Sequence, residues 1–424
     1  MRGPAPLRVE QVLRLLPDVD ALMPLRRYLV SSSQAQPATE PHRTVGKRHV
    51  QPGDLRDFIP QAIATATAHL RALYESAVVA IEAEQVGDFP DVVRALLRAG
   101  KCEQEVGRFA QARVWYDHAL GVAEGLRERG PEIEALHHLG ELEAERDQVD
   151  AAGRLFERTF RLAEAELDQE HAARACLGMA DLAREQHRWQ GAEAWYKRGL
   201  GFAERDPVRG GFLLIGLSDV ARARGLLDVA ALHLDKAREQ FAQSAYGEGV
   251  VHTLNARALL AAETGRNDEA LTLWREGLAE LFGHGGERKL EMTVRVNMCQ
   301  LLLDWGRLTE TEDEVRRAEE RAIVLNQNRQ LARLYVIMGK LRGMQNDDTG
   351  FVFFEKAIEL CQGASVLTRL EAEIYREYAH FRQRLGDREE AMAYLGRAKE
   401  ILETAGDATL LASVDSELRE LPTH

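Results

Sequence analysis

The sequence has 424 residues, of which 45% are hydrophobic and 29% charged, the balance of a folded protein rather than of a disordered or collagen-like chain. Its formal net charge of -13 disfavours a general affinity for nucleic acid or for anionic lipid. The four cysteines are widely spaced and form no CxxC pair, which favours a reducing, cytoplasmic setting. No run approaches about eighteen apolar residues and the first residues lack the apolar core of a signal peptide, so we expect neither membrane insertion nor export.

Residues 1–53 differ from the rest of the chain because they are basic. They carry eight lysines and arginines against four acidic residues, and residues 31–51 show no hydrophobic periodicity. We therefore predict an N-terminal segment that is partly flexible. Its stretch 42–49, HRTVGKRH, could tether nucleic acid or an acidic protein face, whereas a solvated linker, or one that docks on the acidic remainder of the chain, is the simpler interpretation.

Residues 54–90 contain one amphipathic stripe. Its apolar members recur at helical spacing, and a proline stands near the first position of the predicted helix: Pro60, Ile63, Leu70, Leu73, Ala77 and Ile81. The stripe predicts a leading helix or a degenerate repeat.

Residues 91–406 repeat themselves about every forty residues, eight times in succession. A small residue recurs in the middle of the first predicted helix of each unit, at Gly100, Gly140, Ala180, Ser218, Ala258, Cys299, Gly339 and Ala379. Two more small residues usually follow in the second predicted helix. Because two helix axes approach to about 8 Å only where the contacting side chains are small, each unit is predicted to be a tightly packed helical hairpin.

Turn-forming residues separate the two helices of most units with the same period. They include Gly107, Gly225, Gly265, Gly306, Asn346 and Gly386. No strand pattern of period two is present, so the fold class is all-α. Stacked hairpins of this kind form an α-solenoid, whose terminal hairpins need polar-faced caps. Residues 407–424, with Leu410, Leu411, Val414 and Leu418 on one face, are predicted to be the C-terminal capping helix and tail.

The repeating unit resembles the tetratricopeptide repeat. Leu136, Leu139 and Gly140 match the first-helix pattern of that family. The second-helix pattern, a small residue followed by an aromatic and another small residue, is carried by Ala112-Tyr116-Ala119, Ala192-Tyr196-Gly199 and Ala270-Trp274-Gly277. The forty-residue spacing is similar to that of the kinesin-light-chain, cell-polarity-adaptor and bacterial-regulator branches, while HEAT and armadillo repeats share the period but lack these paired small residues. The resemblance implies a right-handed superhelix whose concave groove is lined by the first helices.

We predict partner-binding residues at the positions of the first helices that face this groove. The candidates are Arg94 and Lys101 in the first unit, Asn297 in the sixth, Arg333 and Lys340 in the seventh, and Arg376, His380 and Arg384 in the eighth. The last five form a basic patch in an acidic array and could receive a carboxylate-rich segment, although charges on a solvated face are the simpler interpretation. In the light-chain-like branches that this sequence resembles, an asparagine two residues before the central small residue binds peptide backbone. In this sequence Asn297 alone stands at that position, so the series of asparagines along the groove is absent.

Motifs for catalysis, metal binding or cofactor binding are missing from the sequence. Gly339-Lys340 is followed by Leu341, so it fails as a phosphate-binding loop, and the adjacent His137 and His138 point about 100° apart on a helix, which is unsuitable for one metal ion. We therefore predict a non-enzymatic adaptor or scaffold that binds another protein or a peptide and needs no cofactor, with homo-oligomers possible. The alternative is a sensory regulator whose N-terminal segment is switched by a ligand or partner; an enzyme or nucleic-acid binder is disfavoured.

Overall fold

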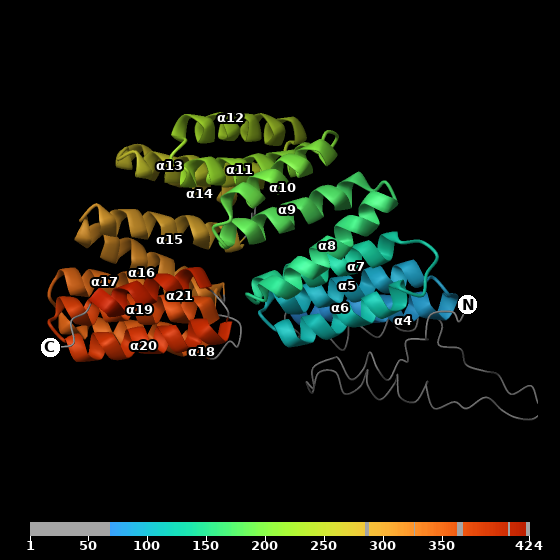
Figure 1. The fold of residues 1–424 in the computed structure, drawn as a ribbon. Helices are drawn as coiled ribbons and strands as arrows, with labels where there is room; N and C mark the ends of the chain where they lie inside the picture. The colour runs from blue at the N-terminus through green and yellow to red at the C-terminus, as the bar shows by residue number, and fades with distance from the viewer. Residues whose placement is uncertain (1–67, 285–287, 326, 363–367, 406–407, 421–424) are drawn as a thin grey trace, which may run out of the picture. The chain divides into compact units, whose positions relative to one another are not determined.

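The computed structural model describes residues 68–284, 288–325, 327–362, 368–405 and 408–420. This part of the chain folds into α-helices, labelled α4 to α21, and one short 3-10 helix, η2, and it contains no β-strand (Figure 1). The basic segment 1–53 and the first residues of the predicted leading helix lie outside the described residues.

Among the described residues, α4 (Ala68–Val86) precedes eight helical hairpins, and α21 (Ala408–Glu420) follows them. In each hairpin a first helix is followed by a tight turn and a second helix. The hairpins are α5 (Phe89–Glu105) with α6 (Phe109–Ala123), α7 (Gly130–Glu145) with α8 (Val149–Ala165), α9 (Gln169–Glu185) with α10 (Trp189–Phe202), α11 (Pro207–Ala223) with α12 (Leu227–Ser244), α13 (Gly247–Glu263) with α14 (Asn267–His284), α15 (Arg288–Asp304) with α16 (Leu308–Val324), α17 (Asn328–Met344) with η2 (Asp348–Gly350) and α18 (Phe351–Gln362), and α19 (Thr368–Arg384) with α20 (Arg388–Ala405). The predicted all-α solenoid of helical hairpins is confirmed.

The turn inside every hairpin contains one residue in the left-handed backbone conformation. It stands seven positions after the central small residue of its unit: Gly107, Asp147, His187, Gly225, Gly265, Gly306, Asn346 and Gly386. In each turn the next residue donates its backbone N–H to a carbonyl near the end of the first helix, as Arg266 N does to Ala261 O at 2.9 Å. This bond closes the helix end, and the left-handed residue makes it possible.

The glycines in the middle of the first helices leave room for an aromatic ring. A Cβ added at Gly100 would lie 2.4 Å from a ring carbon of Tyr116, and one at Gly140 would lie 2.6 Å from a ring carbon of Phe156. Both rings belong to the second helix of the same hairpin and are buried. At these two glycines the missing side chain therefore makes room for an aromatic ring from the second helix of the hairpin, and the two helix backbones are not in direct contact there.

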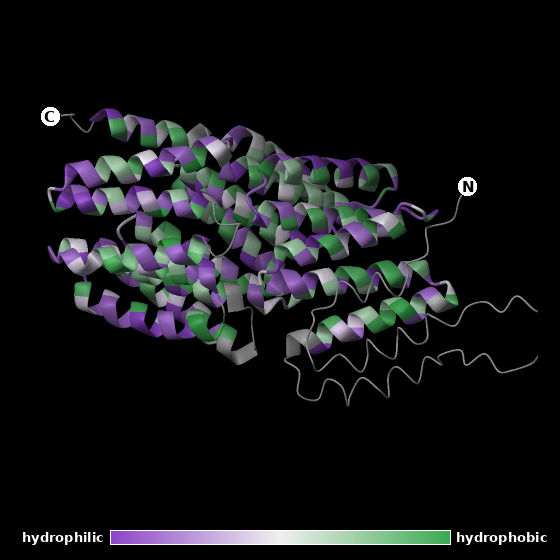
Figure 2. Ribbon diagram, turned by 90° about the horizontal axis from the view of Figure 1, so that it is seen from below, coloured by the Kyte–Doolittle hydropathy of each residue, from purple (hydrophilic) through white to green (hydrophobic). Residues whose placement is uncertain are grey.

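The helices group into two compact units, each of which contains more than one of the forty-residue repeats. From here on, the first unit and the second unit mean these two compact units. The first is made mainly of α4 to α8 and the start of α9, around a core that contains the fully buried Trp115. The second is made mainly of the rest of α9 and the helices up to α21, with core clusters around Trp274 and Phe354. Most helices carry apolar residues along part of their surface and polar residues along the rest (Figure 2). None of the described helices is long and apolar enough to cross a membrane.

The last helix lies where the capping helix is predicted. α21 packs against α20, and Val414 is fully buried within the last core cluster of the second unit. Leu410, Leu411 and Leu418 pack against the same cluster. We therefore keep the interpretation of α21 as the C-terminal cap.

Candidate functional site

The first helices of the second unit form a continuous surface. Each of α11, α13, α15 and α17 contacts the first helix of the next hairpin. The five first helices α11, α13, α15, α17 and α19 therefore lie side by side. The term inner wall refers below to the solvent-facing side chains of these helices, together with those of α9 and α21 at the two ends. The resemblance to tetratricopeptide arrays predicts that this wall receives the partner.

An amide pair stands in the middle of the inner wall. Asn297 on α15 donates its Nδ2 proton to Oδ1 of Asn255 on α13 at 2.9 Å. The same Oδ1 accepts the indole N–H of Trp274 at 2.9 Å, and Trp274 is almost fully buried in the second helix of the hairpin. Two donors thus fix the Asn255 carbonyl oxygen, while the Asn255 Nδ2 group and the Asn297 Oδ1 atom have no hydrogen-bond partner among the described residues.

Arg333 lies on the inner wall of α17 and is exposed. It makes no hydrogen bond or ion pair with any described residue, although Glu373 on α19 acts on it electrostatically. Desolvation by the surrounding protein nevertheless lowers the pKa of Arg333 below its usual value. A guanidinium that is open to water at its surface and still partly desolvated is well placed to bind a carboxylate.

Three of the other predicted basic residues at this end of the wall already have partners. Lys340 Nζ lies 3.3 Å from Glu377 Oε2, and Arg376 Nε donates to Glu417 Oε1 on α21 at 2.8 Å. His380 Nε2 lies 3.1 Å from Glu417 Oε2. The predicted basic patch is therefore largely neutralised from within, because the capping helix supplies a carboxylate to two of its members.

These ion pairs move the pKa values of their members in the expected directions. Burial opposes the charge of Glu377, but His380 and Lys340 outweigh it and hold the pKa of Glu377 at about 2. A hydrogen bond to Glu377 and the charge of Glu417 raise the pKa of His380 above its usual value, against the effect of burial. Both carboxylates are charged at neutral pH, and their charge favours the protonated form of His380 more than in a free imidazole.

The remaining predicted site residues are placed as follows. Arg384 is exposed at the end of α19 and has no hydrogen bond or ion pair with the described residues. Arg94 and Lys101 lie on α5 in the first unit, where both are exposed and Arg94 is paired with Asp91. The structure thus brings Arg333, Lys340, Arg376 and His380 onto two neighbouring helices and leaves Arg94 and Lys101 in the other unit.

A polar network on α9 and α10 is missing from the predicted site residues. Tyr196 donates its hydroxyl proton to Asp181 Oδ1 at 2.6 Å and accepts a hydrogen bond from Arg184 Nε at 3.1 Å. Burial and the nearby Asp181 charge raise the pKa of Tyr196. The sequence holds a signal for this network: Asp181 stands one position after the central small residue Ala180, as Lys340 does after Gly339, and Arg184 stands four positions after it.

At least one polar bridge joins each pair of neighbouring inner-wall helices from α11 to α19, and α19 to the capping helix α21. Running along the inner wall, the bridges are Arg222 with Glu263, Asn255 with Asn297, Thr293 with Gln330, Lys340 with Glu377, and Arg376 with Glu417. The first four bridges each join two successive hairpins, and the last joins the eighth hairpin to α21. The wall is therefore laterally tied by its own polar groups.

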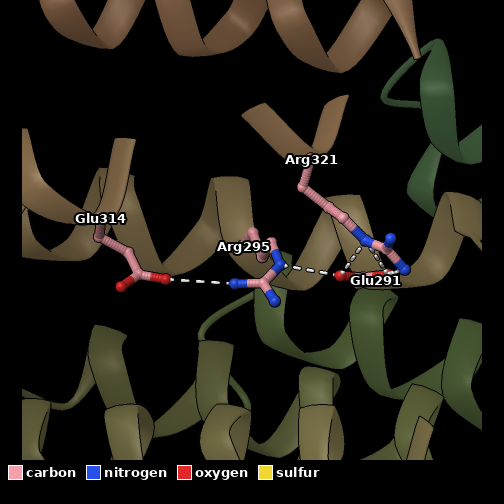
Figure 3. Close-up of polar contacts among 4 residues, drawn as sticks. All are labelled: Glu291, Arg295, Glu314 and Arg321. Atoms are coloured by element: carbon pink, nitrogen blue, oxygen red, sulfur yellow. Dashed lines mark hydrogen bonds and ion pairs between the residues drawn. The ribbon is translucent and has the colours of Figure 1, made fainter. Parts of the chain in front are cut away.

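Charged residues with a structural role lie inside the hairpins. Glu291 on α15 is 5% exposed and accepts hydrogen bonds from Arg321 on α16 at 2.9–3.1 Å and from Arg295 at 3.1 Å (Figure 3). Arg295 also reaches Glu314 at 3.4 Å. Burial opposes the charge of Glu291, but the two guanidinium groups lower its pKa. These contacts saturate the carboxylate and tie the two helices of one hairpin together.

The histidine pair of the first unit shares a carboxylate. His137 Nε2 lies 3.1 Å and His138 Nδ1 lies 3.2 Å from the two oxygens of Glu141. Burial lowers the pKa of His137 to about 4, although the bond to Glu141 opposes this shift. Among the described residues no group of His, Cys, Asp or Glu side chains is arranged to hold a metal ion.

Comparison with known proteins gives similarity at the level of structure only. No protein-family model and no curated protein sequence matches the chain. Among solved structures, a Rap protein complexed with competence and sporulation factor is 11% identical, with a TM-score of 0.57, and the match covers 94% of this chain and 99% of that one. The Rap conjugation gene regulator of plasmid pLS20, in complex with the Phr* peptide, is 14% identical, with a TM-score of 0.53 and coverage of 85% and 89%. These similarities confirm the fold predicted from the sequence, a tetratricopeptide-like array of helical hairpins.

Proposed function

We propose that this chain is a non-enzymatic adaptor or regulator that binds a peptide or an extended protein segment on the inner wall of α11 to α19. The amide pair Asn255–Asn297 carries this proposal. The Asn255 Nδ2 group and the Asn297 Oδ1 atom have no hydrogen-bond partner among the described residues, so the pair offers one N–H donor group and one carbonyl acceptor next to each other. An extended peptide backbone offers the matching acceptor and donor at each residue.

The pair is also held in place before any ligand arrives. Trp274 is 1% exposed and fixes the Asn255 oxygen from below, so the amide orientation does not depend on the partner. A preorganised polar group loses less conformational entropy on binding than a mobile one. Two solved structures of similar fold contain competence and sporulation factor and the Phr* peptide, respectively, which is compatible with a peptide ligand on this fold.

Co-purification tests this proposal. Full-length tagged protein is recovered from a lysate of its native cells, and the accompanying proteins and peptides are identified by mass spectrometry for the wild type and for Asn297→Ala. Loss of one backbone hydrogen bond corresponds to about 1 kcal/mol, or roughly a five-fold weaker complex. Gln243→Ala, an exposed amide on the second helix α12, is the matched control and retains the companion. Recovery of the same companion in equal amount with Asn297→Ala contradicts the proposal.

The alternative function, a regulator, predicts a different effect of deleting residues 1–53. If a ligand on the inner wall switches that segment, its removal alters the response to the ligand while binding to the wall is retained. If the chain is a passive adaptor, the same deletion leaves both unchanged. Comparing partner recovery and downstream response for full-length and shortened protein separates the two.

A further inference from the structure

Arg333 on α17 and Arg384 at the end of α19 are exceptions among the basic side chains of these two inner-wall helices, because neither has a hydrogen bond or ion pair with a described residue. Many other charged side chains of the inner wall in the second unit are engaged in hydrogen bonds or ion pairs: Asp181, Arg184, Asp219, Arg222, Lys340, Glu373, Arg376, Glu377 and His380. Arg333 has neither with any described residue, and it is exposed. A guanidinium offers five N–H donors and has no acceptor, so this group is open to an anionic ligand.

The surroundings of Arg333 favour an acidic group on an otherwise apolar segment. One helical turn further along α17, on the same side of the helix, lies the half-buried apolar side chain of Val336. The neighbouring basic residue Lys340 is neutralised by Glu377 at 3.3 Å. At this position of α17 a ligand therefore meets one available guanidinium beside an apolar side chain, and not a broad basic patch.

The distance to the amide pair can be estimated from repeat geometry. Neighbouring packed helices lie about 10 Å apart. Arg333 stands six residues, and Asn297 two residues, before the central small residue of its own helix, an offset of about 6 Å along the axis. An extended chain advances about 3.3 Å per residue, so roughly three or four residues separate the two contacts.

We propose that the segment bound to the inner wall carries an acidic side chain three or four residues from the stretch held by Asn255 and Asn297, and that Arg333 donates paired hydrogen bonds to that carboxylate. This inference rests on the proposed function. The carboxylate belongs to a side chain rather than to a chain end, because first helices continue the wall on both sides of α17, as α15 and α19. The ligand is therefore an apolar segment with one key Asp or Glu.

A positional peptide library tests the inference. Acetylated and amidated nonapeptides, whose only carboxylates are on side chains, are incubated with the full-length protein, and the retained peptides are identified by mass spectrometry. The wild type is expected to enrich Asp or Glu at one position. Arg333→Gln lowers that enrichment about ten-fold or more, since hydrogen bonds to a charged group are the strong ones. Arg333→Glu selects Lys or Arg at the same position. Arg275→Glu, an exposed residue on the second helix α14, keeps the wild-type preference.

The outcomes separate this inference from the proposed function. Peptide binding without an acidic preference, or with a preference that Arg333→Glu leaves unchanged, overturns the role of Arg333 and leaves the inner wall as a peptide site. A preference that appears only when the peptides have a free C-terminus overturns the choice of a side-chain carboxylate. If the wild type retains no peptide, the proposed function fails as well.

Discussion

Gly216 on α11 offers a sharp test of how successive hairpins pack. A Cβ at Gly216 would lie 2.2 Å from Cε1 and 2.3 Å from Cζ of Tyr196 on α10, well inside ordinary van der Waals contact. The ring is poorly able to move away, because Tyr196 is fully buried and its hydroxyl is bonded to Asp181 and Arg184. Gly216→Ala is therefore expected to introduce overpacking of about 1–3 kcal/mol, near the upper end of that range.

Gly216→Ala also raises the helix propensity of α11, and this stabilising effect has to be separated from the steric cost. Ala in a helix interior is favoured over Gly by about 1 kcal/mol. Gly396 on α20, where an added Cβ meets nothing within 4 Å, supplies the control, because Gly396→Ala gains propensity without a clash. The difference in unfolding free energy between the two variants thus isolates the steric cost, about 1–3 kcal/mol.

Urea denaturation followed by circular dichroism measures both variants, and the slope of each transition shows whether the second unit still unfolds cooperatively. Tyr196→Leu in the Gly216→Ala background is expected to recover part of the loss, a favourable coupling of about 0.5–3 kcal/mol. If Gly216→Ala stabilises the protein as much as Gly396→Ala does, the packing described for the hairpins is wrong.

Three further predictions follow from single residues. Gly265→Ala places a side chain in open space at a φ of 74° and should cost about 1–2 kcal/mol, measured by urea unfolding; unchanged stability contradicts the left-handed turn. Because the pKa of Glu377 is about 2, its contribution to stability is present above the unfolded value of 4.5 and is lost as the pH falls towards 2, so Glu377→Gln should flatten the acid limb of the stability profile. The pKa of His137 is about 4, so the protein loses stability between pH 6.5 and 4 as the unfolded chain takes up this proton; an NMR titration midpoint near 6.5 would falsify the burial of this ring.

The fold could be predicted from the sequence because repetition multiplies a weak signal. A single small residue says little, whereas eight at a spacing of about forty residues define a packing position. The turns were identified where glycine or asparagine occupies the left-handed position, as at Gly265 and Asn346. Asp147 and His187 occupy the equivalent positions in their hairpins, but neither residue type marks a left-handed conformation strongly enough to be recognised alone.

The candidate site could be predicted only in part because its chemistry depends on partners from other helices. Asn297 stood out by its repeat position, while Asn255 did not, since its importance comes from the indole of Trp274 and from Asn297 itself. Arg376 and His380 were recognised as basic. Their contacts with Glu417 join residues 41 and 37 positions apart, and no local pattern specifies such a pairing.

Site-specific photo-cross-linking measures most directly whether the inner wall receives the partner. A photoreactive amino acid is placed at Gln300, on α15 of the inner wall, or at Gln243, on the second helix α12, in otherwise unaltered full-length protein. The expected result is that the co-purifying partner is cross-linked through a short extended segment at position 300 and not at position 243. Cross-linking confined to position 243, with the partner still bound and position 300 unreactive, would show that the partner uses another face of the molecule.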